Sequence, residues 1–164
     1  MNEKLKFRLP TAEDTAEYIS YRQAFLDAGS SMDGTGPMRR TPDPMEWLAI
    51  NAQYADPATV PEGKVQSTQF VCERVSDGRI VGMLQVRLAL NDYLLHYGGH
   101  IGYSVRPDER QRGYASWMLA QGLLPLDGTP KSAHHLPRYE RGEPPDDPAR
   151  GRRIREHRAR AERE

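Results

Sequence analysis

Residues 99–105 read Gly-His-Ile-Gly-Tyr-Ser-Val, residues 110–115 read Arg-Gln-Arg-Gly-Tyr-Ala, and residues 117–120 read Trp-Met-Leu-Ala. The first run is typical of a β-strand, and the last is an apolar segment that continues a helix. The middle run therefore predicts a loop that joins a strand to the first turn of a helix. Such a turn leaves backbone N–H groups without partners and carries a partial positive charge, which suits a diphosphate. Gly113 lets the backbone approach such a ligand, and Ala115 is too small to block it.

The spacing Arg/Gln-x-x-Gly-x-Gly/Ala after a strand resembles the acetyl-coenzyme-A loop of the GNAT acetyltransferases. Residues 100–107, His-Ile-Gly-Tyr-Ser-Val-Arg-Pro, are similar to the fourth strand of that family, which leads into the loop. The glycine loops of kinases and P-loop NTPases are competing interpretations. However, no Gly-Lys-Ser/Thr follows Gly113, and nothing nearby would pair with a metal-bound triphosphate. An ordinary surface turn is the structural alternative.

Composition predicts one soluble globular domain, since 37% of the 164 residues are hydrophobic and 28% are charged. The amino-terminal stretch MNEKLKFRLP is charged, and no segment is long enough to span a bilayer, so we expect a cytoplasmic protein without a membrane partner.

Cys72 is the only cysteine, which excludes an internal disulfide, and we expect it to be a small core residue. Residues 1–120 carry 13 Lys and Arg against 15 Asp and Glu, which argues against nucleic acid as a partner of this part.

Hydrophobic periodicity predicts the element order β, α, α, β, β, β, α over roughly residues 4–120. Thr11 is expected to cap the first helix and Gly29 to end it, and Asp43-Pro44 to open the second helix. Strands are predicted at residues 5–9, 68–75 and 80–90, with a hairpin turn at residues 76–79.

In the strand at residues 80–90, apolar side chains share one face. Gln85 and Arg87 share the other, which predicts a sheet with a core side and a wetter side. The GNAT resemblance implies an α/β (α+β) fold with a mixed, mostly antiparallel sheet flanked by helices. It also implies a fifth strand, a fourth helix and a closing strand pair, and none of these is recognisable after Ala120.

Residues 121–164 form a Pro- and Arg-rich tail that is predicted to be disordered or weakly helical. The domain division is therefore a GNAT-like acetyl-CoA-binding domain at residues 1–120, incomplete, followed by this tail. One hypothesis is a frameshift: back-translation of residues 134–157, advanced by one nucleotide, permits a string that resembles the family's later strand, Asn-x-x-Ser element and Gly-Gly turn. Sequencing of the gene tests this idea.

The resemblance also implies which residues bind the coenzyme. Backbone groups of the fourth strand near Ser104 and Val105 would hold the pantetheine and polarise the thioester carbonyl. Backbone N–H groups of residues 111–116 would hold the diphosphate, and Arg110 and Arg112 would add positive charge, with a solvated surface position as the alternative for both arginines. The expected cofactor-binding residues are Ser104, Val105, Arg110, Gln111, Arg112, Gly113, Tyr114, Ala115 and Ser116.

Amine binding and proton removal need a polar or titratable group near the acceptor. The catalytic candidates are Asp33, in the Gly-rich loop between the first two helices, and His100, at the start of the fourth strand; Asp92, after the third strand, is a further option. Each has a structural alternative. Asp33 can hold its own turn, Asp92 can cap the segment after it, and His100 can be a hydrogen-bonded strand-end residue. Tyr97 and Tyr103 can line an acceptor pocket or pack in a core.

The sequence therefore predicts an N-acetyltransferase that moves an acetyl group from acetyl-CoA to an amine of a small molecule or protein, with no metal. A non-catalytic acyl-CoA-binding or regulatory protein, or an inactive remnant, is the alternative. A third interpretation is nucleic-acid binding by the tail, which is disfavoured because Glu156, Glu162 and Glu164 dilute the seven arginines of residues 149–164. The oligomeric state stays open, with a homodimer as one option.

Overall fold

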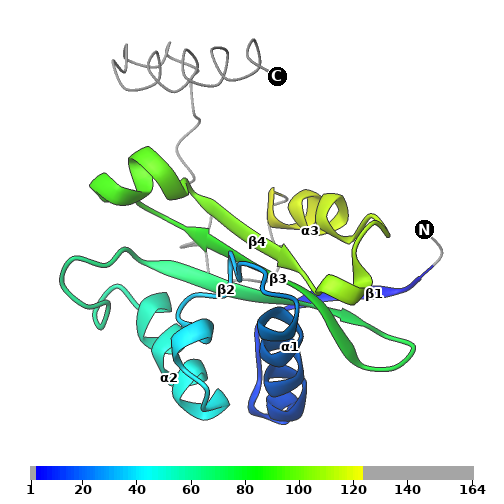
Figure 1. The fold of residues 1–164 in the computed structure, drawn as a ribbon. Helices are drawn as coiled ribbons and strands as arrows, with labels where there is room; N and C mark the ends of the chain where they lie inside the picture. Colours follow the sequence, from blue (N-terminus) through cyan, green and yellow to red (C-terminus); the bar gives the residue numbers. More distant parts are fainter. Residues whose placement is uncertain (1–2, 124–164) are drawn as a thin grey trace, which may run out of the picture.

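A computed structural model describes residues 3–123 of the chain (Figure 1). The strands are β1 (Leu5–Arg8), β2 (Ser67–Arg74), β3 (Arg79–Arg87) and β4 (Ile101–Val105), and the α-helices are α1 (Thr15–Asp27), α2 (Pro44–Ala55) and α3 (Tyr114–Leu123). Short helical turns are η1 (Ala12–Asp14), η2 (Met38–Arg40), η3 (Leu94–Gly98) and η4 (Pro107–Glu109). The strands form one antiparallel sheet in the order β1-β2-β3-β4. The predicted element order and the predicted α/β class, an antiparallel sheet flanked by helices, are therefore confirmed.

Helix α3 runs to Leu123, three residues beyond the predicted domain boundary at residue 120. The predicted tail from residue 124 onward, the aberrant carboxyl-terminal strands and helix, and the frameshift hypothesis lie outside the described residues. None of the helices in the described part of the chain has the length and hydropathy of a membrane span.

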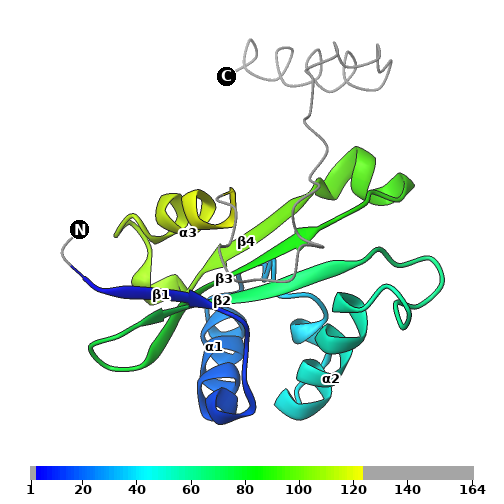
Figure 2. The same ribbon diagram turned by 180° about the vertical axis from the view of Figure 1, so that it is seen from behind.

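Helices cover both faces of the sheet. Figures 1 and 2 show α1 and α2 on one face and α3 on the other. The core between the sheet and the first two helices consists of Tyr18, Tyr21, Phe25, Met32, Met38, Trp47, Val71, Ile80 and Met83. The core beneath α3 consists of Phe70, Cys72, Val81, Leu84, Val86, Tyr114 and Met118. Cys72 is fully buried, which confirms its prediction as a small core residue.

The third strand differs from its prediction in two respects. It ends at Arg87 instead of residue 90, because Asn91 turns the chain: its side-chain carbonyl accepts the Leu94 N–H at 3.0 Å at the start of η3. The predicted wetter face is also wrong, since Gln85 is only 5% exposed. The α1–α2 loop covers this face, and a Cβ on Gly36 of that loop would lie 3.4 Å from the Gln85 side-chain nitrogen.

Two of the three predicted helix caps are confirmed. Asp43 caps α2, because its carboxylate accepts backbone N–H groups of the first turn. Gly29 ends α1 with a φ of +58°. The predicted Thr11 cap is wrong: its hydroxyl donates to the Asp14 carboxylate at 2.9 Å, and α1 begins at Thr15 after the turn η1. That carboxylate also pairs with a strand arginine, so it draws the hydroxyl away from the helix end.

The α1–α2 loop, residues 28–43, lies directly against β4. A Cβ on Gly34 would lie 2.2 Å from the Gly102 carbonyl oxygen, so only glycine permits this approach. The Gly34 carbonyl accepts the side-chain N–H of Gln69 at 2.8 Å, which ties the loop to the middle of the sheet. The loop thereby holds the strand that leads to the candidate site.

Candidate functional site

Residues 110–113 connect η4 to the start of α3 at Tyr114. Two of them have left-handed backbones: φ is +64° at Gln111 and +84° at Gly113. A Cβ on Gly113 would meet no atom within 4 Å, so a ligand can approach the backbone there. A non-glycine residue such as Gln111 adopts this conformation at a cost of about 1–2 kcal/mol. Strain of this kind clusters at functional loops.

The backbone N–H groups of residues 111–116 are available to a ligand. The first backbone hydrogen bond of α3 joins the Trp117 N–H to the Gly113 carbonyl at 3.1 Å. Among residues 3–123, no protein acceptor pairs with the N–H groups of residues 111–116. Because these groups belong to a left-handed loop and to a helix start, they form an anion-binding arrangement of the kind that holds phosphates.

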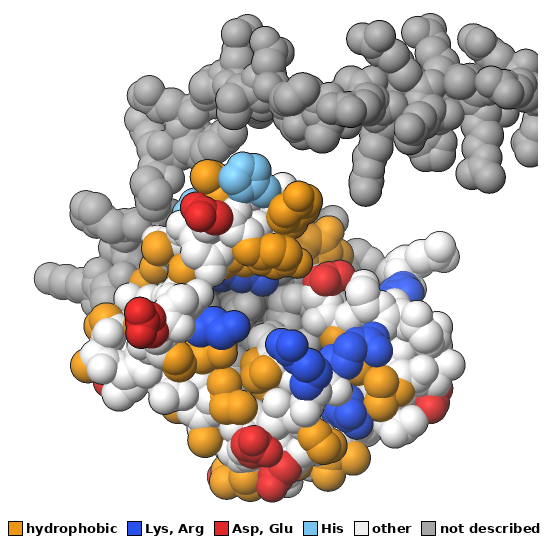
Figure 3. Space-filling view, turned by 60° about the vertical axis from the view of Figure 1, so that its left-hand side comes forward, with side chains coloured by type: hydrophobic (Ala, Val, Ile, Leu, Met, Phe, Trp, Pro, Cys, Tyr) orange, Lys and Arg blue, Asp and Glu red, His pale blue; other side chains and the backbone are white. Residues whose placement is uncertain are grey.

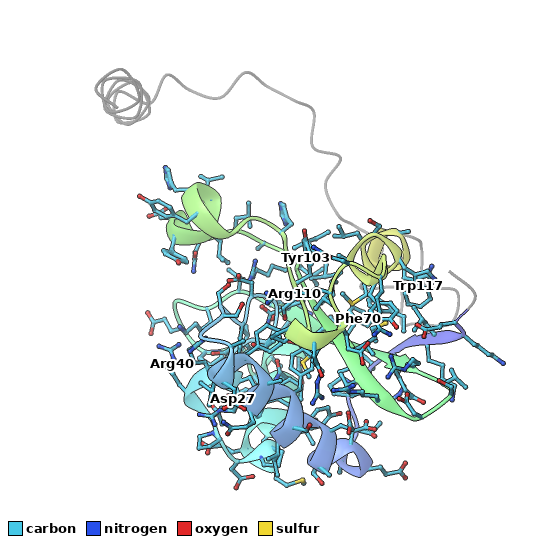
Figure 4. All side chains as sticks on the ribbon, turned by 45° about the vertical axis from the view of Figure 1, so that its right-hand side comes forward. Asp27, Arg40, Phe70, Tyr103, Arg110 and Trp117 are labelled. Atoms are coloured by element: carbon cyan, nitrogen blue, oxygen red, sulfur yellow. The ribbon has the colours of Figure 1, made fainter. Side chains whose placement is uncertain are left out.

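A cleft of about 300 Å³ lies at this end of α3. Figure 4 shows two of its lining residues, Tyr103 and Arg110, beside α3. The lining consists of Tyr103, Val105, Arg110, Gln111, Gly113, Tyr114 and Ala115. Apart from Tyr103, each of these is a residue that the sequence analysis assigns to the coenzyme. Arg112 and Ser116, which are exposed, and Ser104, which is buried, do not line it.

Strand β4 presents a free backbone edge beside the cleft. It is outermost in the sheet and, within the described residues, pairs only with β3. Alternate residues of an antiparallel pair direct their N–H and C=O groups to the partner strand. The bond from the Arg87 N–H to the His100 carbonyl, 2.8 Å, sets this alternation. Ser104 therefore faces β3, whereas Tyr103 and Val105 direct their backbone groups outward.

The Ser104 side chain and carbonyl are both engaged by α1. The Tyr21 hydroxyl lies 3.1 Å from each of the two Ser104 oxygens. Burial raises the pKa of Tyr21, so its hydroxyl stays a protonated donor. The backbone available to a pantetheine beside this cleft is therefore that of Tyr103 and Val105, and the Val105 carbonyl already accepts the Arg110 side chain at 3.3 Å.

The two loop arginines have different surroundings. Arg110 turns toward α1: its guanidinium donates to the Ser30 hydroxyl at 2.7 Å and lies 5.7 Å from the centre of the Phe25 ring. Arg112 lies 3.3 Å from the Glu109 carboxylate, with 52% of its side chain exposed. Arg112 therefore has the freedom to turn toward a bound anion, whereas Arg110 contributes to the wall of the cleft.

The two catalytic candidates are not among the residues that line this cleft. His100 directs Nδ1 at the Arg87 carbonyl, 2.9 Å away. Asp33 is exposed, and its carboxylate accepts the Ser31 hydroxyl at 2.8 Å, which holds its own turn. Neither side chain lines the cleft. Asp92 does not serve as the cap that was its structural alternative, because the side chain of the preceding Asn91 accepts the Leu94 N–H.

The tyrosines that were considered for an acceptor pocket differ in their placement. Tyr103 is 43% exposed and lines the cleft, whereas Tyr97 is 82% exposed on η3. Figure 1 shows η3 projecting beyond the sheet, and Figure 3 shows hydrophobic side chains and a histidine gathered at that end, with basic side chains across the middle of the same face. Tyr97 is not among the residues that line the cleft.

A buried carboxylate that the sequence analysis did not single out lies beneath the loop. Glu109 is 2% exposed and accepts guanidinium hydrogen bonds from Arg74 at 2.9 Å and Arg79 at 2.6 Å. Hydrogen bonds to Asp77 and then to Glu109 raise the pKa of Arg74. The two arginines flank a hairpin turn 30 or more residues earlier in the chain, so no local pattern indicates this contact.

No group of three or more His, Cys, Asp or Glu side chains in residues 3–123 is arranged to hold a metal ion. No protein-family model matches the sequence, and no curated protein matches it. Among solved structures, the chain is similar to that of a predicted acetyltransferase with acetyl-CoA from Clostridium acetobutylicum. The two share 13% identity over 72% of this chain and 70% of that chain, with a TM-score of 0.38.

Proposed function

We propose that this chain is an N-acetyltransferase of the GNAT type, which binds acetyl-CoA at the loop of residues 110–116 and transfers the acetyl group to an amine. The observation that carries the proposal is made within residues 3–123: the N–H groups of residues 111–116 have no protein acceptor there, and they lie next to a cleft and to the outer edge of β4. The resemblance of Arg110-Gln111-Arg112-Gly113-Tyr114-Ala115 to the family's loop supports the same ligand.

The residues present fit a coenzyme diphosphate. The open space at Gly113 admits phosphate oxygens to the backbone, and the start of α3 contributes its partial positive charge. The bound coenzyme supplies the acetyl thioester. The outward backbone groups of Tyr103 and Val105 are then available to hydrogen-bond the pantetheine arm.

Calorimetric titration with acetyl-CoA tests the binding step. Ala115→Glu places a carboxylate in the lining of the cleft, where it repels a diphosphate but suits the first turn of a helix. We expect it to weaken binding by about tenfold or more. Ala120→Glu, on an exposed position of the same helix, is the matched control and retains affinity. Wild-type protein that shows no heat of binding, or equal affinity in both variants, refutes the proposal.

A non-catalytic acyl-CoA-binding protein is the second candidate, because neither Asp33 nor His100 lines the cleft. Release of free thiol across a panel of primary amines separates the two functions. An enzyme releases thiol at a rate that depends on the amine, and a binder does not. Asp33→Asn and His100→Gln then test the acceptor side: slower turnover with unchanged acetyl-CoA affinity supports catalytic roles, and unchanged turnover assigns both residues to structure.

A further inference from the structure

Residues 110–113 carry the first of the N–H groups that have no acceptor within residues 3–123. This loop lies between Glu109 and Tyr114, and both of these residues are buried. One guanidinium nitrogen of Arg74 lies 2.9 Å from the Glu109 carboxylate and 3.4 Å from the Tyr114 hydroxyl. A single side chain of β2 therefore joins the residue before the loop to the residue after it.

The Arg74 guanidinium is itself held firmly. Its other nitrogens donate to Asp77 at 2.7 and 3.0 Å, in the turn between β2 and β3. Arg79, the cross-strand neighbour of Arg74, donates to the second oxygen of Glu109 at 2.6 Å. Both carboxylate oxygens of Glu109 are thus fixed by arginines from adjacent strands, and this buried charge is paired on both sides.

We propose that Arg74 and Glu109 form a buried staple that holds both ends of residues 110–113 and so positions the loop N–H groups for a diphosphate. The proposal rests on the proposed function for its ligand, but its structural part concerns the free chain. The left-handed backbone of Gln111 is a conformation that persists only where neighbouring contacts impose it. The staple supplies such contacts at both ends of the loop, and within the loop the Arg110 side chain adds its bonds to Ser30 and to the Val105 carbonyl.

The staple also places Arg112. Its guanidinium lies 3.3 Å from the same Glu109 oxygen that accepts Arg74. With half of its side chain exposed, Arg112 is the guanidinium that a bound diphosphate can draw from Glu109. Glu109 remains paired with Arg74 and Arg79 when this happens, so the exchange leaves no buried charge alone.

Glu109→Gln removes the charge and keeps the shape of the side chain. In the ligand-free protein we expect hydrogen exchange at the Trp117 N–H, whose acceptor is the Gly113 carbonyl of the loop, to accelerate by about tenfold. We expect affinity for coenzyme A to fall by about tenfold, and affinity for pantetheine, which lacks the diphosphate, to change by less than about twofold. Asp14→Asn is the control, because it removes a carboxylate that pairs with another strand arginine, Arg8, and contacts neither the staple nor the loop; it leaves all three quantities unchanged.

Arg74→Lys serves if Glu109→Gln does not fold, since lysine keeps the charge but cannot hold Asp77 with two nitrogens while a third contacts Glu109 and Tyr114. Unchanged exchange at the Trp117 N–H overturns the staple, and so does an equal loss of affinity for coenzyme A and pantetheine. If the wild-type protein binds no coenzyme A, the proposed function fails. The exchange measurement on the ligand-free variants still decides whether the staple holds the loop.

Discussion

Gly34 offers a sharp test of how the α1–α2 loop is docked on β4. Its φ is +70°, and a Cβ there would lie 2.2 Å from the Gly102 carbonyl oxygen and 2.4 Å from the Tyr103 nitrogen. These are backbone atoms of a strand that is hydrogen-bonded to β3, so they cannot yield easily. In Gly34→Ala the loop must therefore move away from the sheet.

The expected cost has two parts. An alanine with a left-handed backbone costs about 1–2 kcal/mol. Displacement of the loop breaks the hydrogen bond from the Gln69 side chain to the Gly34 carbonyl, and an unpaired buried group costs about 1–3 kcal/mol. Gly34→Ala should thus lower the free energy of unfolding by about 2–5 kcal/mol.

Gly78 supplies a matched control. Its φ is +72°, but a Cβ there would meet no atom within 4 Å, so Gly78→Ala carries only the backbone part of about 1–2 kcal/mol. Urea unfolding followed by circular dichroism measures both variants, with the m-value as a check that the unfolding transition is the same. Equal destabilisation by Gly34→Ala and Gly78→Ala refutes the steric argument and with it the close docking of the loop on β4.

Three further predictions concern single groups. Cys72 lies in the core, and burial raises its pKa to about 12, so a thiol reagent at pH 8 should modify it only in unfolded protein; fast labelling of native protein contradicts this. Two hydrogen bonds from Arg8, both 2.8 Å, lower the pKa of Asp14, so the pair stabilises the fold above the ordinary Asp pKa of about 4 and this contribution is lost as the pH falls through the lowered value. In Asp14→Asn, the free energy of unfolding, measured by chemical denaturation, should therefore fall less steeply as the pH is lowered. An unchanged pH dependence of this free energy contradicts the proposed role of the Asp14–Arg8 pair. Tyr21→Phe removes the hydroxyl that contacts both Ser104 oxygens and should cost about 1–3 kcal/mol, measured by urea unfolding.

Interactions between near neighbours in the chain could be predicted from the sequence. The cap at Asp43 and the left-handed stop at Gly29 depend on residues within one helical turn, so a local pattern carries the whole signal. The loop before α3 is of the same kind, since Gly113 and the apolar run after it already indicate a strand-to-helix connection. Thr11 shows the limit: its local capping pattern yields to a carboxylate that also pairs with β1.

Contacts between distant segments could not be predicted in this way. Gln85 looks like a solvent-facing residue in an alternating strand, but a loop that lies about 50 residues earlier covers it. Glu109 looks like one more surface acid before the loop, yet two arginines of the β2–β3 hairpin bury it. The charge on a side chain is visible in the sequence, whereas its partner depends on which strands become neighbours.

The amino-acid sequence by itself determined the order of strands and helices and the position of the strand–loop–helix segment, because periodicity and turn residues act over a few positions. The mostly antiparallel sheet was expected from the family resemblance. Only the tertiary structure decided that residues 103–115 enclose a cleft, that Asp33 and His100 lie outside it, and that Arg74 reaches the loop from β2. Those facts depend on strand order and on which side chains are buried together, and both arise when distant segments pack.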